Sequence, residues 1–299
     1  MYRIILPALL LAAASLGAPA IAAPVHPAFE VAVSGQTGDQ DQGPGRHIVL
    51  IPGLASSGEV WRETAAHLCA PGTGRQCHVL TLAGFAGAAP VEGDLLAQVE
   101  SQLAAYLAEH RLQQPVIIGH SLGGFLGLKL AIDYPQQVGK LVVVDALPAL
   151  GAAQLASITP EQLQQMAAQL RSAMQAQDDA SFAANARRSV ASMASAPDDI
   201  ARIAGWGQRS SRSTVTDAMA AIMGQDLRQD VARIKAPVLV LGSWAAYKGY
   251  ATRDAIAQTF RDQYRQLPGV QIVLAESARH FIMYDERDWM LERIDTFLK

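Results

Sequence analysis

The chain has 299 residues, half of them hydrophobic, and a formal net charge of -3. This length allows one large domain or two small ones, with enough apolar residues to bury a sizeable core. Because the basic residues form no cluster, the sequence predicts no nucleic-acid partner and no attraction to an acidic surface.

The N-terminal residues have the pattern of an export signal. One positive charge and an apolar run precede Ala20-Ile21-Ala22, which fits the small-x-small cleavage pattern. We therefore expect residues 1–22 to be removed and the mature protein to be periplasmic or secreted. The competing interpretation is an uncleaved membrane anchor, but Gly17, Pro19 and the short apolar run argue against it. We expect no membrane span in the mature chain.

Short apolar strands alternate with helical segments along most of the chain. In chain order we predict strands at 29–33 and 47–53, a helix at 58–68, a strand at 78–82, a helix at 92–112, a strand at 115–119, a helix at 121–135, strands at 140–145 and 236–242, a helix at 251–267, a strand at 270–276 and a helix at 285–299. This alternation predicts an α/β fold with a mostly parallel central sheet flanked by helices. Residues 148–234 contain no convincing strand. They predict a helical cap inserted into a core of residues 23–147 and 235–299.

The two cysteines of the chain, Cys69 and Cys77, flank a Pro-Gly-Thr-Gly segment. Such a segment forms a turn, so the two thiols can meet. In an oxidising compartment we expect a disulfide between them. The alternative is two separate thiols. A metal site is not predicted, because two thiols do not complete a tetrahedral shell.

Ser121 lies in Gly119-His120-Ser121-Leu122-Gly123, where a predicted strand turns directly into a helix. The two backbones crowd each other in such a turn, which explains the glycines and leaves the serine hydroxyl exposed at the carboxyl edge of the sheet. The helix N-terminus also favours negative charge at this point. We predict that Ser121 is a nucleophile. The alternative is an ordinary glycine-rich turn.

A serine nucleophile needs a base, and the base needs an orienting acid. Of the seven histidines, His280 follows a late strand and precedes the final helix, so its loop overhangs the carboxyl edge of the sheet. His120 adjoins the serine but occupies the wrong side of the turn. The other histidines lie where packing or solvated roles are commoner. We predict His280 as the base, the alternative being a surface histidine.

These motifs resemble the α/β-hydrolase family over nearly the whole mature chain. The matching stretches are "HIVLIPGLASSGEVW", "VIIGHSLGG", "LVVVD", "DVARIKAPVLVLGS" and "ARHFIMYDE". The resemblance implies a helical cap and a small-molecule acyl substrate, with no metal or organic cofactor. It also implies an oxyanion hole formed by the backbone amides of Leu54 and Leu122.

The acid departs from the family pattern. The family usually has Gly-x-x-Asp after the penultimate strand, whereas this chain has Ala245 at the aspartate position. The next aspartate, Asp254, is expected on the following helix and too remote. Some lipases and dehalogenases of this fold take the acid from the neighbouring strand end, where this chain has Asp145. We predict Asp145 as the acid. The alternatives are that Asp145 only caps a turn, or that Glu276 acts, although we expect Glu276 to lie still on its strand.

The sequence therefore predicts an exported serine hydrolase that cleaves carboxylic esters through an acyl-enzyme. The same triad could instead serve an amidase, an aminopeptidase or a lactonase. A non-catalytic binding protein is a further alternative, favoured by the missing acid at position 245. The sequence predicts neither the acyl and alcohol groups of the substrate nor an oligomeric state.

Overall fold

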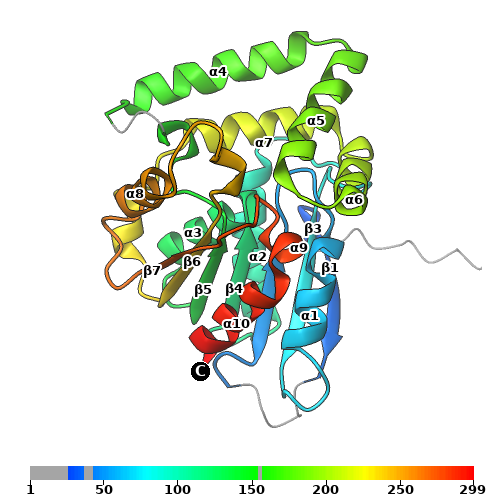
Figure 1. Cartoon of the computed structure of the whole chain (residues 1–299). Coiled ribbons are helices and arrows are strands. Elements are labelled where there is room, and N and C mark those ends of the chain that lie inside the picture. The colour runs from blue at the N-terminus through cyan, green and yellow to red at the C-terminus, as the bar shows by residue number, and fades with distance from the viewer. Residues whose placement is uncertain (1–25, 37–42, 154–156) are drawn as a thin grey trace, which may run out of the picture.

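Seven strands form one central sheet in the computed structural model, which describes residues 26–36, 43–153 and 157–299. The strand order is β1-β3-β2-β4-β5-β6-β7 (Figure 1). β1 is antiparallel to β3, and all the other neighbouring pairs are parallel. The strands are β1 Phe29–Gly35, β2 His47–Ile51, β3 Gln76–Leu82, β4 Val116–His120, β5 Lys140–Val144, β6 Val238–Gly242 and β7 Gln271–Leu274. The predicted α/β fold with a mostly parallel sheet is confirmed.

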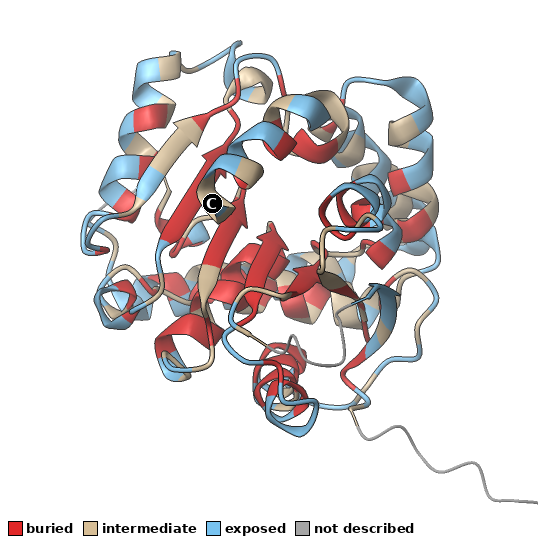
Figure 2. Ribbon diagram, turned by 90° about the horizontal axis from the view of Figure 1, so that it is seen from below, coloured by how far each residue is buried: buried red, intermediate tan, exposed pale blue. Residues whose placement is uncertain are grey.

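Helices cover both faces of the sheet. Alternate residues of a strand point to opposite faces, and the buried apolar side chains separate accordingly into two clusters. α2, α3 and α8 contribute to one cluster and α1 and α10 to the other, so the central strands are buried on both sides (Figure 2). The helices of the core are η1 Gly58–Trp61 (a 3₁₀ helix), α1 Arg62–Leu68, α2 Leu95–Glu109, α3 Leu122–Asp133, α8 Arg253–Gln263, α9 Ile282–Asp285 and α10 Arg287–Leu298.

A helical region separates β5 from β6 in the chain. Its main helices are α4 Pro160–Ala176, α5 Asp179–Met193, α6 Pro197–Gln208 and α7 Arg212–Gly224. The side chains of Thr159, Asp178 and Ser211 accept hydrogen bonds from the first turns of α4, α5 and α7, which fixes where these helices begin. Figure 1 shows the region lying over one end of the sheet. The described residues between β5 and β6 contain no strand, which confirms the predicted helical insertion. The domain limits themselves remain predictions.

The predicted signal peptide, residues 1–22, lies outside the described residues. In the described ranges, the structure contains no helix long and apolar enough to cross a membrane.

A disulfide joins Cys69, just after α1, to Cys77 in β3. Both residues are buried. The bond closes a loop with a sequence separation of 8 residues around the predicted turn. The expected cysteine pair is therefore present in the structure.

Reduction is expected to lower the free energy of unfolding by about 2.5 kcal/mol, because the reduced unfolded chain gains the freedom of the opened loop. Denaturant titration with and without a reductant measures the change. A Cys69→Ala, Cys77→Ala variant is the control, since its stability should not respond to the reductant. Two thiols that react with an alkylating agent in the non-reduced native protein would contradict the disulfide.

A buried series of hydrogen-bonded side chains links β2, β3 and α2. His47 Nδ1 lies 3.1 Å from His78 Nε2, and His78 Nδ1 lies 2.8 Å from the Tyr106 hydroxyl. Burial, together with the neighbouring His47 and His110, lowers the pKa of His78 from 6.5 to about 4. These histidines hold packed elements together only while they remain largely neutral.

Acid is therefore expected to destabilise the fold. The folded pKa of His78 lies below the unfolded value, so the unfolded chain binds the extra proton between pH 6.5 and about 4. Stability contributed by neutral His78 is complete above pH 6.5 and is lost as the pH falls through that window, by up to about 3 kcal/mol. Melting temperatures between pH 4 and 7 measure the loss. The slope should be smaller in His78→Gln than in wild type. Equal slopes in the two proteins would contradict this explanation.

Candidate active site

Ser121 occupies a strained turn between β4 and α3. Its φ is 52° and its ψ is -118°, a conformation that non-glycine residues rarely adopt. A Cβ atom on Gly119 would lie 2.1 Å from the Gly123 carbonyl oxygen, and one on Gly123 would lie 2.2 Å from the Ile51 carbonyl oxygen. Glycine is thus required at both positions for β2, β4 and α3 to approach this closely. The result is a serine raised at the carboxyl end of β4, as expected of a nucleophile elbow.

His280 and Asp145 meet beside this turn, although they lie 135 positions apart in the chain. His280 Nδ1 donates a hydrogen bond of 2.7 Å to Asp145 Oδ2. Ser243, just after β6, adds two more donors: its N–H lies 2.7 Å from Asp145 Oδ1 and its Oγ lies 2.9 Å from Oδ2. Charge-assisted hydrogen bonds of this kind stabilise an ionised carboxylate. The Asp145 side chain is 8% exposed and the His280 side chain 23%, so the pair is sheltered but reachable.

The loop after β5 fixes the direction of the Asp145 carboxylate. Asp145 has a φ of 49°, and its N–H donates to the Leu241 carbonyl at 2.7 Å, which continues the β5–β6 pairing. Two side chains from the end of α8 hold the next residues. Gln263 bonds both the N–H and the carbonyl of Ala149 at 3.0 Å, and the Tyr264 hydroxyl donates to the Ala146 carbonyl at 2.8 Å. The loop is thereby held close to β6 and Ser243.

His120 holds the loop that carries His280. It is fully buried, its Nε2–H donates to the His280 carbonyl oxygen at 3.1 Å, and the two rings lie 4.4 Å apart between centroids. Burial lowers the pKa of His120 well below its ordinary value, and the adjacent His280 lowers it further. His120 therefore stays neutral and does not place a second positive charge beside His280. This role of His120 was not predicted from the sequence. The one signal for it is that His120 is the last residue of β4, directly before Ser121.

Carboxylates fix the other side of the same loop. Asp285 Oδ2 accepts the Arg279 N–H at 2.8 Å, and Glu286 Oε1 accepts the Ala278 N–H at 2.9 Å. The Phe281 N–H donates to the Met193 carbonyl at 3.0 Å, which ties the loop to the end of α5. His280 is thus held by the sheet, by the chain just before α10 and by the helical region.

The predicted oxyanion donors lie on either side of the elbow. Leu122 is the first residue of α3, where an N–H has no partner in the helix, and Leu54 lies in the turn after β2. Neither N–H donates a hydrogen bond to another described residue. A Cβ on Gly53 would lie 3.3 Å from the Ser121 Cβ, which places the β2 turn directly against the serine.

Ser121 Oγ and His280 form no hydrogen bond in the structure. The His280 loop is nevertheless attached to the residue before Ser121, because His120 donates to the His280 carbonyl oxygen. Hydrogen bonds between a nucleophile and its base are often long without substrate and shorten when substrate binds. Proton transfer from Ser121 Oγ to His280 Nε2 requires that this hydrogen bond form.

The other acid candidates are elsewhere. Ala245 begins η4 (Ala245–Tyr247) and carries no carboxylate, Asp254 lies in the first turn of α8, and the carboxylate bonded to His280 is that of Asp145. The expectation that Glu276 lies on its strand is wrong, because β7 ends at Leu274. Glu276 is exposed and pairs with Arg253 at 2.6 Å, so its carboxylate is directed at α8 rather than at the imidazole.

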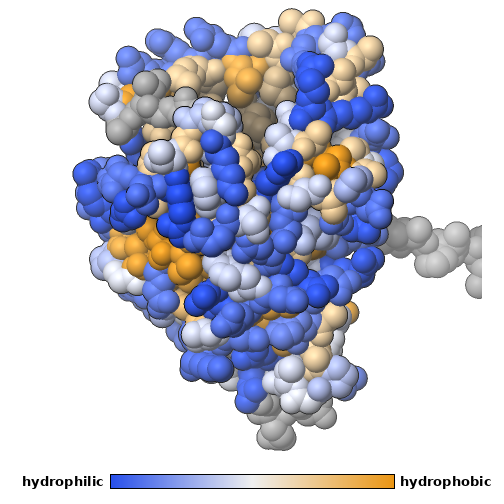
Figure 3. All heavy atoms as spheres, viewed as in Figure 1, coloured by the Kyte–Doolittle hydropathy of each residue, from blue (hydrophilic) through white to orange (hydrophobic). Residues whose placement is uncertain are grey.

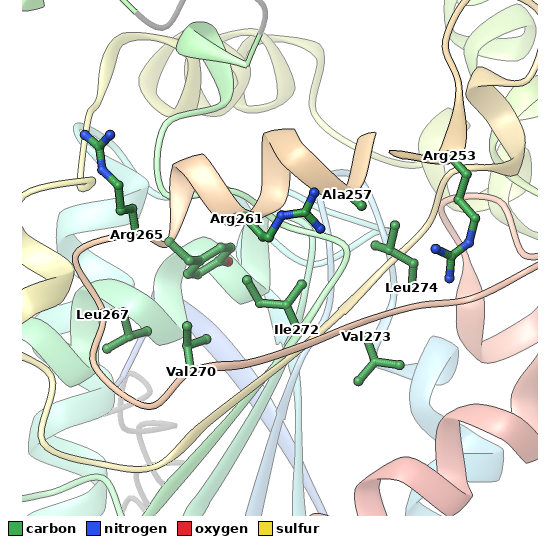
Figure 4. A pocket seen from close by; sticks show the side chains of 10 residues that line it. Arg253, Ala257, Arg261, Arg265, Leu267, Val270, Ile272, Val273 and Leu274 are labelled. Atoms are coloured by element: carbon green, nitrogen blue, oxygen red, sulfur yellow. The ribbon is translucent and has the colours of Figure 1, made fainter. Parts of the chain in front are cut away.

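A groove of about 490 Å³ lies away from these residues, between α8 and the edge strand β7. Figure 4 shows the apolar side chains of Ile272, in β7, and of Val270, just before it, below Arg261 on α8. Figure 3 shows an apolar patch in the same region. None of the predicted site residues lines this groove. Within the described ranges, no cluster of three or more His, Cys, Asp or Glu side chains is arranged to hold a metal ion.

The sheet, the serine elbow and the inserted helices together define an α/β-hydrolase fold. A profile described as "Alpha/beta hydrolase family" matches residues 48–293, and the chain belongs to that family. It is a hydrolase with esterases among its relatives. Solved structures of this fold include a hydrolase from Pseudomonas aeruginosa PA01, with a TM-score of 0.71 and 18% identity over 90% of this chain and 94% of that one. The enol-lactonase from Burkholderia xenovorans LB400 has a TM-score of 0.70 and 17% identity, over 90% of this chain and 96% of that one. At these identities the likeness shows the fold alone.

Two curated relatives match part of the chain. A "Pimeloyl-[acyl-carrier protein] methyl ester esterase" of Vibrio parahaemolyticus is 34% identical over 113 residues, which are 38% of this chain and 42% of that protein. A "Putative carbamate hydrolase RutD" of Yersinia enterocolitica is 33% identical over 116 residues, 37% of this chain and 40% of that protein. The chain thus matches less than half the length of either relative.

Proposed function

We propose that the chain is an exported serine esterase that hydrolyses carboxylic esters through an acyl-enzyme. The observation that carries the proposal is the hydrogen-bonded series from Ser243 through Asp145 to His280, which lies beside the strained Ser121 turn. The match to an esterase of Vibrio parahaemolyticus supports ester chemistry.

Each group has a defined role in this mechanism. Asp145 accepts the Nδ1–H of His280, which leaves Nε2 free to take the Ser121 proton as the oxygen attacks the acyl carbon. The negative charge on the substrate oxygen is stabilised by the amides of Leu54 and Leu122. His280 then gives its proton to the departing alcohol, whose C–O bond breaks. Water repeats the sequence on the acyl-enzyme and releases the carboxylic acid.

Export is proposed on two grounds. Residues 1–22 have the composition of a signal peptide. In addition, the Cys69–Cys77 disulfide is of a kind that persists in oxidising compartments and is rare in the cytosol. The test is the N-terminal residue and the location of the protein expressed from its full sequence. Cleavage should leave Ala23 first, and an intact N-terminus in the cytosolic fraction would contradict export.

Amide, carbamate or lactone hydrolysis is the second candidate. The match to a relative named as a carbamate hydrolase favours it, since the same groups can attack any of these carbonyls. The non-catalytic alternative was favoured by the missing acid at position 245. That reason is weaker because a carboxylate contacts His280 from β5 instead.

A substrate survey tests the proposal. Purified protein is assayed with p-nitrophenyl esters of graded chain length and, in parallel, with aminoacyl anilides, phenyl carbamates and lactones of similar size. We expect the highest kcat/KM on an ester and covalent labelling by an organophosphonate at Ser121. Preference for an anilide, carbamate or lactone would support the second candidate. Protein that is folded but neither turns over nor labels would support the non-catalytic alternative.

A further inference from the structure

A second groove opens beside the His280 loop, between the helical region and the core. It has a volume of about 400 Å³ and is lined by Arg188, Ala191 and Ser192 of α5, by Ala245 and Ala246 of η4, and by Arg279. Arg279 is the residue before His280, and Ala245 follows Ser243 by two positions. The η4 side of the groove therefore continues from Ser243, which holds Asp145, and Arg279 leads directly into His280. Figure 3 shows strongly hydrophilic side chains around the hollow between α5 and the loop after β6.

The charge of this groove is positive. Its lining contains two guanidinium groups and no carboxylate, in a chain whose net charge is -3. Arg279 Nη1 is fixed by the carbonyl oxygens of Ala191 and Ala194, each at 3.1 Å, while Nε and Nη2 bond no other described residue. Arg188 donates to the neutral Asn185 side chain. Neither arginine forms an ion pair with any described carboxylate, so both retain donors suited to an anion.

The position of the acid explains why the groove is cationic. The family pattern would put an aspartate at position 245, and its carboxylate would lie in the same lining as both arginines. Because Asp145 approaches His280 from β5, position 245 carries a methyl group instead. The other lining side chains are also small, which leaves room for a substrate group between the guanidinium groups.

We propose that this groove binds an anionic group of the substrate, so that the preferred esters carry a carboxylate a few bonds from the scissile carbonyl. The proposal rests on the proposed esterase function and names its substrate class. Arg188 and Arg279 bind the carboxylate, and the groove adjoins the catalytic pair through Arg279, the residue before His280.

The test compares monoethyl glutarate with its terminal carboxamide analogue, which has nearly the same shape without the charge. At low ionic strength, where surface charges are least screened, wild-type kcat/KM should be at least about tenfold higher for the anionic ester. Arg188→Gln should lower the ratio of the two kcat/KM values about tenfold. Arg187→Gln is the matched control, since Arg187 is the preceding exposed residue of α5 but does not line the groove. Ala245→Asp should also lower the ratio, because it adds a carboxylate to the lining.

Three outcomes are distinguishable. A wild-type ratio near one, or equal effects of Arg188→Gln and Arg187→Gln, would overturn the groove proposal while leaving the esterase intact. If neither ester is hydrolysed, ligand-detected NMR measures whether monoethyl glutarate binds to the Ser121→Ala protein. Binding that is lost on adding Arg188→Gln would then support the groove and count against the esterase, and no binding would overturn the groove proposal.

Discussion

Replacing Ser121 with alanine is expected to lower kcat on a short-chain ester by up to about 10⁶-fold, the size of effect seen when a serine protease loses its nucleophile. The reason is that Ser121 carries the hydroxyl of the strand-to-helix turn beside the His280–Asp145 pair, whereas the nearby Ser243 hydroxyl is bonded to Asp145. Some hydrolysis above the uncatalysed rate should remain, because the free amides of Leu54 and Leu122 and the binding groove are unchanged.

The fold should survive this change. Ser121 Oγ makes no hydrogen bond to another described residue, and alanine meets the same backbone constraint at a φ of 52°. Circular dichroism and the melting temperature check folding, and Ser101→Ala, an exposed serine on α2, is the control for handling and purity. An organophosphonate should label wild type once and Ser121→Ala not at all. A folded Ser121→Ala protein that keeps a tenth of wild-type kcat would reject Ser121 as the nucleophile.

Much of the fold followed from local patterns. Apolar runs such as "HIVLI" and "VIIGH" alternate with helices of recognisable spacing, and each strand and helix is set largely by residues close to it in the chain. The Ser121 turn could also be predicted from the sequence, because the steric reason for Gly119 and Gly123 lies within the motif. The Asp145–His280 contact followed from topology, since neighbouring parallel strands end at the same edge of a sheet.

The features of the site that the sequence did not predict depend on contacts between segments that are far apart in the chain. Ser243 donates twice to a carboxylate 98 positions away, and His120 bonds a carbonyl 160 positions away. No periodicity or spacing encodes such contacts, because they arise only after the sheet has assembled. The misplaced Glu276 has a similar cause: β7 lies at the sheet edge and ends where the chain turns into the His280 loop, two residues before the glutamate. The cationic groove likewise forms only where α5 meets η4.

Replacing Asp145 with asparagine is expected to lower kcat by about 10⁴-fold with little change in fold, as an equivalent change does in a serine protease. The oxygen of the substituted side chain can still accept the Ser243 N–H, but its amide nitrogen would then face both Ser243 Oγ and His280 Nδ1. An amide nitrogen only donates, so it favours the imidazole tautomer with the proton on Nε2. That tautomer cannot accept the Ser121 proton.

The control for this prediction is Ser243→Ala, which removes one donor of 2.9 Å to the carboxylate but keeps the charge and the His280 contact. Its kcat should fall only about tenfold, the value of roughly one hydrogen bond. Adding Ala245→Asp to Asp145→Asn should restore part of the activity on a neutral short-chain ester, because η4 follows the strand next to β5 and can present a carboxylate from the usual family position. The measurement is kcat, with circular dichroism to establish folding. A folded Asp145→Asn protein within a few-fold of wild type would mean that Ser121 and His280 act without this acid, since the carboxylate of Glu276 is already bound to Arg253.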